Sequence, residues 1–237
     1  MIIKTRAIVL TSLKYGDSSR IVRFYTESKG IKSLMFKGAY AKKNRQVSLF
    51  MPLNLVELVF EEKPKHDLEN FREAKNLYHY QNLHLNPAKT TISLFLTEIL
   101  HHVLKEEEAN PRMFQFLWTS MEIFDQKKTG YADFHLWFLF QLTKFLGFYP
   151  NLQLGAKYFD LNEGVSTNQI PSGFYISQHE LTDWEKLSQL NFLTEIHPRF
   201  NQNSRNEILN NLLKYYELHI FDFQRPKSLE ILKQVFD

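Results

Sequence analysis

Residues 53–60, with the sequence LNLVELVF, decide the fold that this chain is predicted to adopt. The run is rich in aliphatic and β-branched side chains, and the turn sequence EEKP at residues 61–64 ends it. Polar and apolar positions alternate only weakly because both faces of this strand are apolar. Such a strand suits a small closed barrel better than one side of an open sheet.

Four further strands are predicted before residue 80, at residues 7–10, 21–25, 31–36 and about 67–76. Turn sequences separate the first three, YGDS at residues 15–18 and SKG at residues 28–30. Five short strands with a basic face describe an OB-fold, a small barrel that often binds nucleic acid. We therefore predict an OB-fold nucleic-acid-binding domain at residues 1–80.

The periodicity becomes helical after Asn86. Asn86 followed by Pro87 is typical of an N-cap with proline at the first helical position, and Asn110 with Pro111 repeats the signal. A third helix, at about residues 131–148, is apolar nearly all round. It is expected to form the buried axis of a helical bundle.

The sequence after residue 150 predicts a small insertion followed by three more helices. Residues 158–161 and 165–170 indicate a short hairpin. Thr182 with Glu185 and Ser204 with Glu207 are possible capping boxes, and a last short helix is expected at about residues 228–236. The predicted class is α+β, with the barrel followed by a helical domain at residues 81–237 that carries a cysteine-free hairpin or loop insertion at about 151–181.

Residues 30–46, with the sequence GIKSLMFKGAYAKKNRQ, suggest a binding surface. Six Lys or Arg residues and no acidic residue fall between Lys29 and Arg45. Phe36 and Tyr40 bracket Lys37, so aromatic faces and positive charges could share one surface, as binding of single-stranded nucleic acid requires. The alternative interpretation is a solvated, lysine-rich turn.

The charge distribution along the chain favours the binding interpretation. Residues 1–50 carry eleven Lys and Arg against two acids, a net charge of +9, while the whole chain carries only +3. The rest of the chain is therefore acidic. A basic first fifth is expected to meet a polyanion, most commonly nucleic acid. An acidic protein surface or an anionic membrane is the alternative, but no basic amphipathic helix is visible here to lie on a bilayer.

The search for catalytic motifs is negative. The sequence contains no cysteine, no G-x-x-x-x-G-K-[ST], no G-x-G-x-x-G and no H-E-x-x-H. Glu98 and His101 form a single E-x-x-H without the second copy that a di-iron site needs. We expect no catalytic residue, no cofactor and no metal site. No signal peptide and no membrane span are expected either.

Several motifs together resemble one protein family. Residues 7–39, with YGDSSRIV at 15–22 and FKGA at 36–39, resemble the amino-terminal OB-fold of the RecO family of bacterial DNA repair proteins. Residues 134–152, which end in L-G-x-x-P-x-L, are similar to that family's central helix. YYELH at 215–219 and KSL at 227–229 are similar to its last helices. The matches span the chain in order.

This resemblance implies a non-enzymatic mediator of DNA repair and recombination. It implies binding to single- and double-stranded DNA, annealing of complementary strands, and joint action with RecR to help RecA replace the single-stranded DNA-binding protein SSB. It also implies a cytoplasmic, nucleoid-associated protein of bacteria. Many members hold zinc through four cysteines in the segment that here covers residues 153–173, which has none, so no zinc is expected.

The family is also expected to take the carboxyl-terminal tail of SSB into a pocket of its helical domain. The sequence does not define that pocket, and only the cations near candidate helices can be named: Arg112, Lys127, Lys128 and Lys144.

Two groups of residues are predicted to contact DNA. The first group comprises Lys37, Lys42, Lys43 and Arg45. The second comprises Arg6, Arg20, Arg23 and Lys32, with Phe36 or Tyr40 stacking on bases. Arg20 and Arg23 have a structural alternative, because an arginine in a strand often lies across a barrel surface.

Two rival functions stay open. One is a nucleic-acid enzyme or an RNA-binding OB-fold accessory protein. The other is a scaffold whose basic region docks an acidic protein.

Overall fold

The computed structural model describes residues 1–37, 45–62, 69–105, 107–192 and 200–235. The chain divides into two compact units, Met1–Asp125 and Gln126–Asp237. The first unit extends beyond residue 80 because two helices pack with the barrel. The predicted domain boundary at residue 80 stays a prediction.

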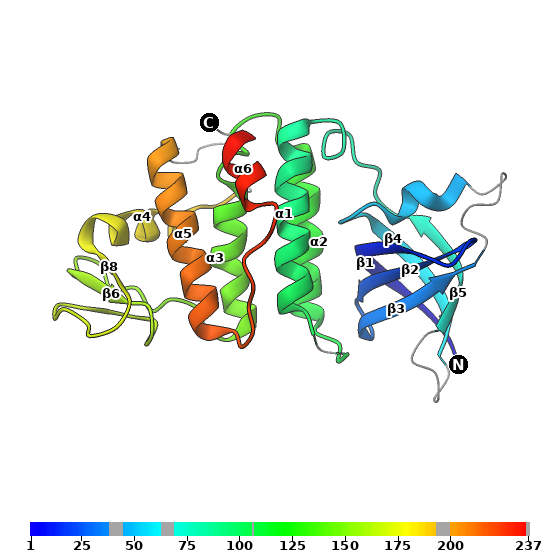
Figure 1. Cartoon of the computed structure of the whole chain (residues 1–237), viewed down its shortest axis with the longest axis horizontal. Helices are drawn as coiled ribbons and strands as arrows, with labels where there is room; N and C mark the ends of the chain where they lie inside the picture. Colours follow the sequence, from blue (N-terminus) through cyan, green and yellow to red (C-terminus); the bar gives the residue numbers. More distant parts are fainter. Residues whose placement is uncertain (38–44, 63–68, 106, 193–199, 236–237) are drawn as a thin grey trace. The chain divides into compact units, whose positions relative to one another are not determined.

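The first unit contains a closed barrel of the OB-fold type, which confirms the predicted architecture (Figure 1). Its described strands are β1 (Ile2–Tyr15), β2 (Ser19–Thr26), β3 (Gly30–Phe36), β4 (Leu55–Glu61) and β5 (Glu69–Asn76), in the order β1-β2-β3-β5-β4. Neighbouring strands are antiparallel except for β3 and β5, whose short parallel pairing, Leu34 with Glu69, closes the barrel.

The strand β1 is much longer than the predicted residues 7–10. Its first half pairs with β4 and its second half with β2, and a bulge between Val9 and Thr11 lies in its pairing with β2. A bulge bends a strand, so one strand can belong to both sides of a barrel. The ends of β1 were missed because their pairing with β4 and β2 leaves no local pattern in the sequence.

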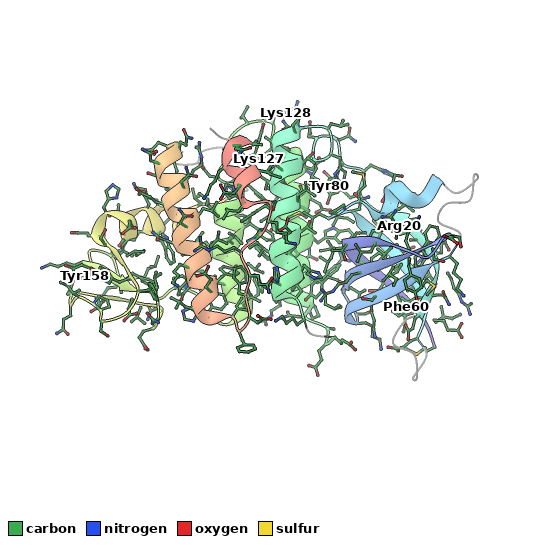
Figure 2. All side chains as sticks on the ribbon, in the orientation of Figure 1. Arg20, Phe60, Tyr80, Lys127, Lys128 and Tyr158 are labelled. Carbon is green, nitrogen blue, oxygen red and sulfur yellow. The ribbon has the colours of Figure 1, made fainter. Side chains whose placement is uncertain are left out.

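Phenyl rings fill the barrel interior. Phe36 stacks on Phe71 at a centroid distance of 5.0 Å, and Phe50 lies 5.1 Å from Phe36 and 5.5 Å from Phe71. Phe24 meets Phe50 and Phe71 edge to face, at 6.3 Å from each. Phe60, which lies among the barrel strands in Figure 2, is fully buried in the same core. These rings join β2, β3, β4, β5 and the 3-10 helix η1 (Arg45–Phe50).

Two helices complete the first unit, α1 (Pro87–Val103) and α2 (Pro111–Gln126). Both predicted starts are confirmed. Asn86 Oδ1 accepts a hydrogen bond from the Lys89 N–H, and Asn110 Oδ1 accepts one from the Met113 N–H. On the outer face of the barrel, Tyr25 packs against Phe114 of α2 with a centroid distance of 6.0 Å.

The Asp125 carboxylate connects the end of α2 to residues 81–83, which follow the barrel. It is 1% exposed and accepts hydrogen bonds from the backbone N–H groups of residues 81, 82 and 83, at 2.8–2.9 Å. The Tyr78 hydroxyl lies 3.2 Å from the same carboxylate. Lys89 Nζ donates to the Phe124 and Asp125 carbonyls, where a cation suits a helix C-terminus.

The second unit is built around α3 (Phe134–Leu146), whose side chains are buried along most of its length. It packs with α4 (Gln178–Gln189) and α5 (Gln202–His219), and Tyr216 of α5 donates a hydrogen bond to the Leu139 carbonyl. A short α6 (Leu229–Val235) follows. The prediction of a buried central helix is confirmed, although the helix is shorter than residues 131–148.

Both predicted capping boxes of this unit are wrong. The α4 helix already begins at Gln178, before Thr182, with Ser177 as its N-cap and a Ser177–Glu180 capping box. The α5 helix is capped by Asn201, whose Oδ1 accepts from the Ser204 N–H. In both places an earlier residue of the same capping type was present, so the motif alone did not identify the first turn.

The predicted hairpin is one part of a three-stranded sheet. The strands β6 (Tyr158–Asp160), β7 (Val165–Thr167) and β8 (Tyr175–Ser177) lie in the order β7-β6-β8. The third strand, β8, was not predicted. Phe159 of β6 is fully buried against Trp184 of α4 and Tyr215 of α5, so aromatic packing holds this cysteine-free segment.

We predict that Asp125→Asn lowers the free energy of unfolding by about 2–4 kcal/mol, because an amide nitrogen would face backbone N–H donors in a buried site. Urea denaturation measures the loss. Asp17→Asn, at an exposed turn, is the matched control and should leave the midpoint nearly unchanged. Equal midpoints for the two variants would contradict the anchoring role of Asp125.

Gly164→Ala is expected to destabilise the second unit more than Gly155→Ala. Both glycines have positive φ, +70° and +77°, so both alanines carry backbone strain of about 1–3 kcal/mol. Only at Gly164 would the new Cβ also lie 2.6 Å from the Tyr215 hydroxyl oxygen, whereas nothing lies within 4 Å at Gly155. Thermal melting of both variants checks this, and an equal loss would show that the Tyr215 contact is unimportant.

Candidate nucleic-acid interface

The basic segment, defined as residues 37–45, follows β3 in the sequence and ends at the first residue of η1. Lys37 follows directly after β3 and is exposed. Arg45 is the first residue of η1. Tyr40, Lys42 and Lys43 lie outside the described residues, so their assignment as DNA contacts stays a prediction.

Both ends of this segment are fixed to the barrel. Phe36, the last residue of β3, and Phe50, the last residue of η1, touch inside the core. Asn54 Nδ2 donates to the Ser48 and Leu49 carbonyls at 2.9 and 3.0 Å, which fixes η1 from its other side. The basic segment therefore leaves the barrel and returns to it at neighbouring points.

His84 completes the support of η1. Its Nε2 lies 2.8 Å from Asn54 Oδ1. Because Oδ1 can only accept, Nε2 carries the hydrogen in this contact. Tyr80 packs edge to face on His84 and donates from its hydroxyl to the Leu53 carbonyl at 2.6 Å. The segment after the barrel thus holds the loop that precedes β4.

The Phe36 ring lies inside the barrel, whereas stacking on a base requires an exposed ring. Its side chain is buried, and its ring stacks on Phe71 inside the barrel. Side chains alternate between the two faces of a strand, so Phe36 points to the same inner face as Leu34. Phe36 contributes to the core and presents no ring face to a ligand.

Arg6 lies between the barrel and α2. Its guanidinium makes two hydrogen bonds to the Glu27 carboxylate, at 2.9 and 2.6 Å, and one to Gln115 at 3.2 Å. The hydrogen bond from Arg6 holds the pKa of Glu27 below its ordinary value. The guanidinium carbon also lies over the Phe114 and Trp118 rings, at 5.4 and 5.1 Å. Arg6 is therefore held by contacts within the first unit.

Arg23 reaches the C-terminal end of α1. Its Nη2 donates to the Leu104 carbonyl and its Nη1 meets His101 Nδ1, both at 2.8 Å. Burial, followed by the positive charge of Arg23, lowers the pKa of His101. Neutral His101 can therefore accept the hydrogen bond from Arg23. This is the second half of the Glu98-x-x-His101 pattern, and it serves the contact between barrel and helix.

Arg20 lies across β1 on the barrel (Figure 2). Its Nε donates to Ser12 Oγ at 2.7 Å and its Nη2 to the Ser12 carbonyl at 2.9 Å. Arg20 and Arg23 therefore both make hydrogen bonds to neighbouring elements of the first unit, and their assignment as DNA contacts stays a prediction.

Lys32 is half-buried near Glu62, at the end of the barrel where Lys29 also lies. The hydrogen bond from Lys29, at 2.9 Å, is the main cause that lowers the pKa of Glu62, and the charge of Lys32 adds to it.

Cations of the β1-β4-β5 side are paired with acids. Lys4 and Lys75 both contact Glu57, at 3.1 and 2.9 Å, and Arg72 contacts Glu61 at 2.8 Å. This arrangement neutralises much of the charge on that side. Residues 37–45, in contrast, carry four Lys or Arg and no acid in the sequence.

Two exposed apolar residues of the barrel were missed by the sequence analysis. Leu13 and Tyr15 lie in the second half of β1, beyond the predicted end of that strand. Their exposed fractions are 66% and 52%. The signal that could have found them is the alternation of residues 11, 13 and 15 with the more polar residues 12 and 14.

The cations named for the SSB-tail pocket and the possible metal ligands are the remaining candidates. Among the described residues, no group of three or more His, Cys, Asp or Glu side chains is placed to hold a metal ion. Arg112 lies in the first turn of α2 in the first unit, whereas Lys127, Lys128 and Lys144 belong to the second. The pocket for the SSB tail stays a prediction.

No helix in the described ranges combines the length and hydropathy needed to cross a membrane.

Comparison with known proteins covers nearly the whole chain. Residues 1–80 match the family described as Recombination protein O N terminal, and residues 84–230 match Recombination protein O C terminal. A protein named DNA repair protein RecO from Flavobacterium johnsoniae is 37% identical over 239 residues. Proteins of the same name from Bacteroides fragilis and Porphyromonas gingivalis are 37% and 31% identical. In each case the match covers 100% of both chains. The chain belongs to the RecO family.

Proposed function

We propose that this chain is a non-enzymatic mediator of DNA repair and recombination. It binds single- and double-stranded DNA through its barrel and anneals complementary strands. With RecR, it helps to load RecA onto DNA coated with SSB, whose carboxyl-terminal tail it contacts. Family membership supports the role in repair and recombination, and a barrel of the OB-fold type supports the nucleic-acid ligand. This role would place the protein at the nucleoid, in the bacterial cytoplasm.

The observation that carries the proposal is the concentration of positive charge between β3 and η1. Lys37, Lys42 and Lys43 lie between the two elements and Arg45 begins η1, with no acid among residues 37–45, and the segment begins and ends at the barrel. Lys and Arg contacts to phosphates give affinity without sequence preference. A mediator that acts wherever single-stranded gaps arise needs this kind of affinity.

The same charge accounts for strand annealing. Repulsion between phosphates opposes the encounter of two complementary strands, and screening by cations reduces it. A basic surface that neutralises both strands raises the rate at which they meet, after which base pairing proceeds without help. The step needs no catalytic side chain and no nucleotide hydrolysis.

Contacts within the barrel divide the candidate cations into two groups. We assign Lys37, Lys42, Lys43 and Arg45 to phosphate binding. We assign Arg6, Arg20 and Arg23 mainly to internal packing, because each makes short hydrogen bonds to neighbouring elements. Lys32 is assigned to neither group, because the nearby Glu62 carboxylate partly offsets its charge.

Charge reversal tests the phosphate-binding group. Lys42→Glu/Lys43→Glu is expected to weaken binding of labelled single-stranded DNA at least tenfold at low salt. It should also flatten the plot of log affinity against log salt by about 1.4, because each lost contact with a single strand removes about 0.7. Fluorescence anisotropy over a salt series measures both quantities, and addition of purified SSB and RecR then tests the mediator step.

The matched control is Lys105→Glu/Lys157→Glu, which changes the net charge equally at exposed positions outside the segment in the sequence. Equal losses for the two double variants would show that only net charge matters. Absence of DNA binding and annealing by the wild-type protein would contradict the proposed function itself.

Arg6→Gln is expected to show the opposite behaviour. Loss of the contacts to Glu27 and the Trp118 ring should lower the free energy of unfolding by about 1–2 kcal/mol, a modest amount because solvent screens the partly exposed pair. The DNA affinity of the folded variant should remain within about twofold of wild type. Urea denaturation and anisotropy check the two statements. A large loss of affinity with unchanged stability would move Arg6 into the phosphate-binding group.

A further inference from the structure

A row of apolar side chains crosses the outer face of the barrel. Leu13, Ile21 and Met35 are directly opposite one another in β1, β2 and β3. The next residues in register, Val22 and Leu34, are fully buried in the core. Because side chains alternate between the two faces of a strand, the row of Leu13, Ile21 and Met35 points outward. Tyr15, two residues beyond Leu13, lies on the same face; these four residues are called the outer row below.

The outer row differs from another row on the same outer face. Ile8, Tyr25 and Ile31 are also opposite one another, and they are 0%, 3% and 7% exposed. Tyr25 packs there against Phe114 of α2. In contrast, Leu13 and Tyr15 are mostly exposed, and Ile21 and Met35 are half-buried. One part of this apolar face therefore has a partner within the unit, whereas the outer row presents its side chains to solvent.

Charge indicates what could cover the outer row. Lys37 is exposed two residues after Met35, at a position with the same parity as the outer row. Asp17, in the turn between β1 and β2, is the single acid among residues 12–26. Apolar side chains beside a cation fit a ligand with flat apolar faces and a negative backbone. Unpaired nucleotides have this combination, and a duplex does not, because its base faces are stacked inside.

We propose that the outer row contacts the unpaired bases of single-stranded DNA, with the Tyr15 ring stacking on a base and Leu13, Ile21 and Met35 packing against others. This inference rests on the proposed DNA-binding function and adds to it a source of preference for single strands. The outer row leads directly into the basic segment through Phe36 and Lys37. One strand of DNA could therefore place its bases on the row and a phosphate against the exposed Lys37.

The test uses Leu13→Ala/Tyr15→Ala and three fluorescent probes at one salt concentration. The probes are an unstructured single strand, an abasic strand with the same number of phosphates, and a duplex. The variant should bind the normal single strand about 5- to 100-fold more weakly than wild type. Its affinity for the abasic strand and the duplex should remain within about twofold, because the phosphate contacts are unchanged.

Ile2→Ala is the control variant. Ile2 is also an exposed apolar residue of β1, 57% exposed, and it lies at the opposite end of that strand. This variant should bind all three probes as wild type does. Circular dichroism and urea midpoints should show that both variants are folded, because the replaced side chains are mostly exposed.

Several results would overturn the inference. Unchanged affinity of the double variant for the normal strand would exclude base contacts and would favour a protein partner for the outer row. Equal losses on all three probes would indicate a general effect on the phosphate surface. If wild type binds the normal and abasic strands equally, the inference fails while the proposed function stands. If wild type binds no probe, both fail.

Discussion

Contacts among four phenyl rings inside the barrel are the constraint on which the rest of the first unit depends. Phe24, Phe36, Phe50 and Phe71 belong to β2, β3, η1 and β5, and they hold these elements at one point. The contact between Phe36 and Phe50 also brings together the two ends of the basic segment. A lysine-rich segment gains little from packing, so its return to the barrel depends on the rings at its two ends. The core thus fixes the two points of the barrel that the basic segment connects.

The cations of the barrel serve two purposes that sequence alone does not separate. Arg6 joins the barrel to α2 through its hydrogen bond to Gln115 and its contact with the Trp118 ring, and Arg23 joins it to α1 through the Leu104 carbonyl. These side chains are ordered by their partners and are poorly suited to follow a mobile phosphate chain. The basic segment, in contrast, contains no acid in its own sequence that could pair with its lysines. The chain therefore combines fixed arginines for assembly with a concentrated charge that we propose for DNA.

The fold could be predicted largely from local pattern, whereas the side-chain roles could not. The two apolar faces of residues 53–60 and the Asn86 and Asn110 caps were sufficient for the barrel and the first helices. The full length of β1 depends on pairing with β2 and β4, which no local pattern shows. The partners of Arg6 and Arg23, Gln115 and Leu104, lie 109 and 81 residues away. The inward direction of Phe36 depends on strand parity, and Leu13 and Tyr15 were missed because the predicted strand ended at residue 10.

The central claim is that the basic segment of the barrel binds DNA phosphates. The most direct test is the slope of log affinity against log salt concentration for wild-type protein and a single-stranded oligonucleotide. Four phosphate contacts, one for each of Lys37, Lys42, Lys43 and Arg45, predict a slope of about −3. A slope near zero, or no measurable affinity at low salt, would contradict the account.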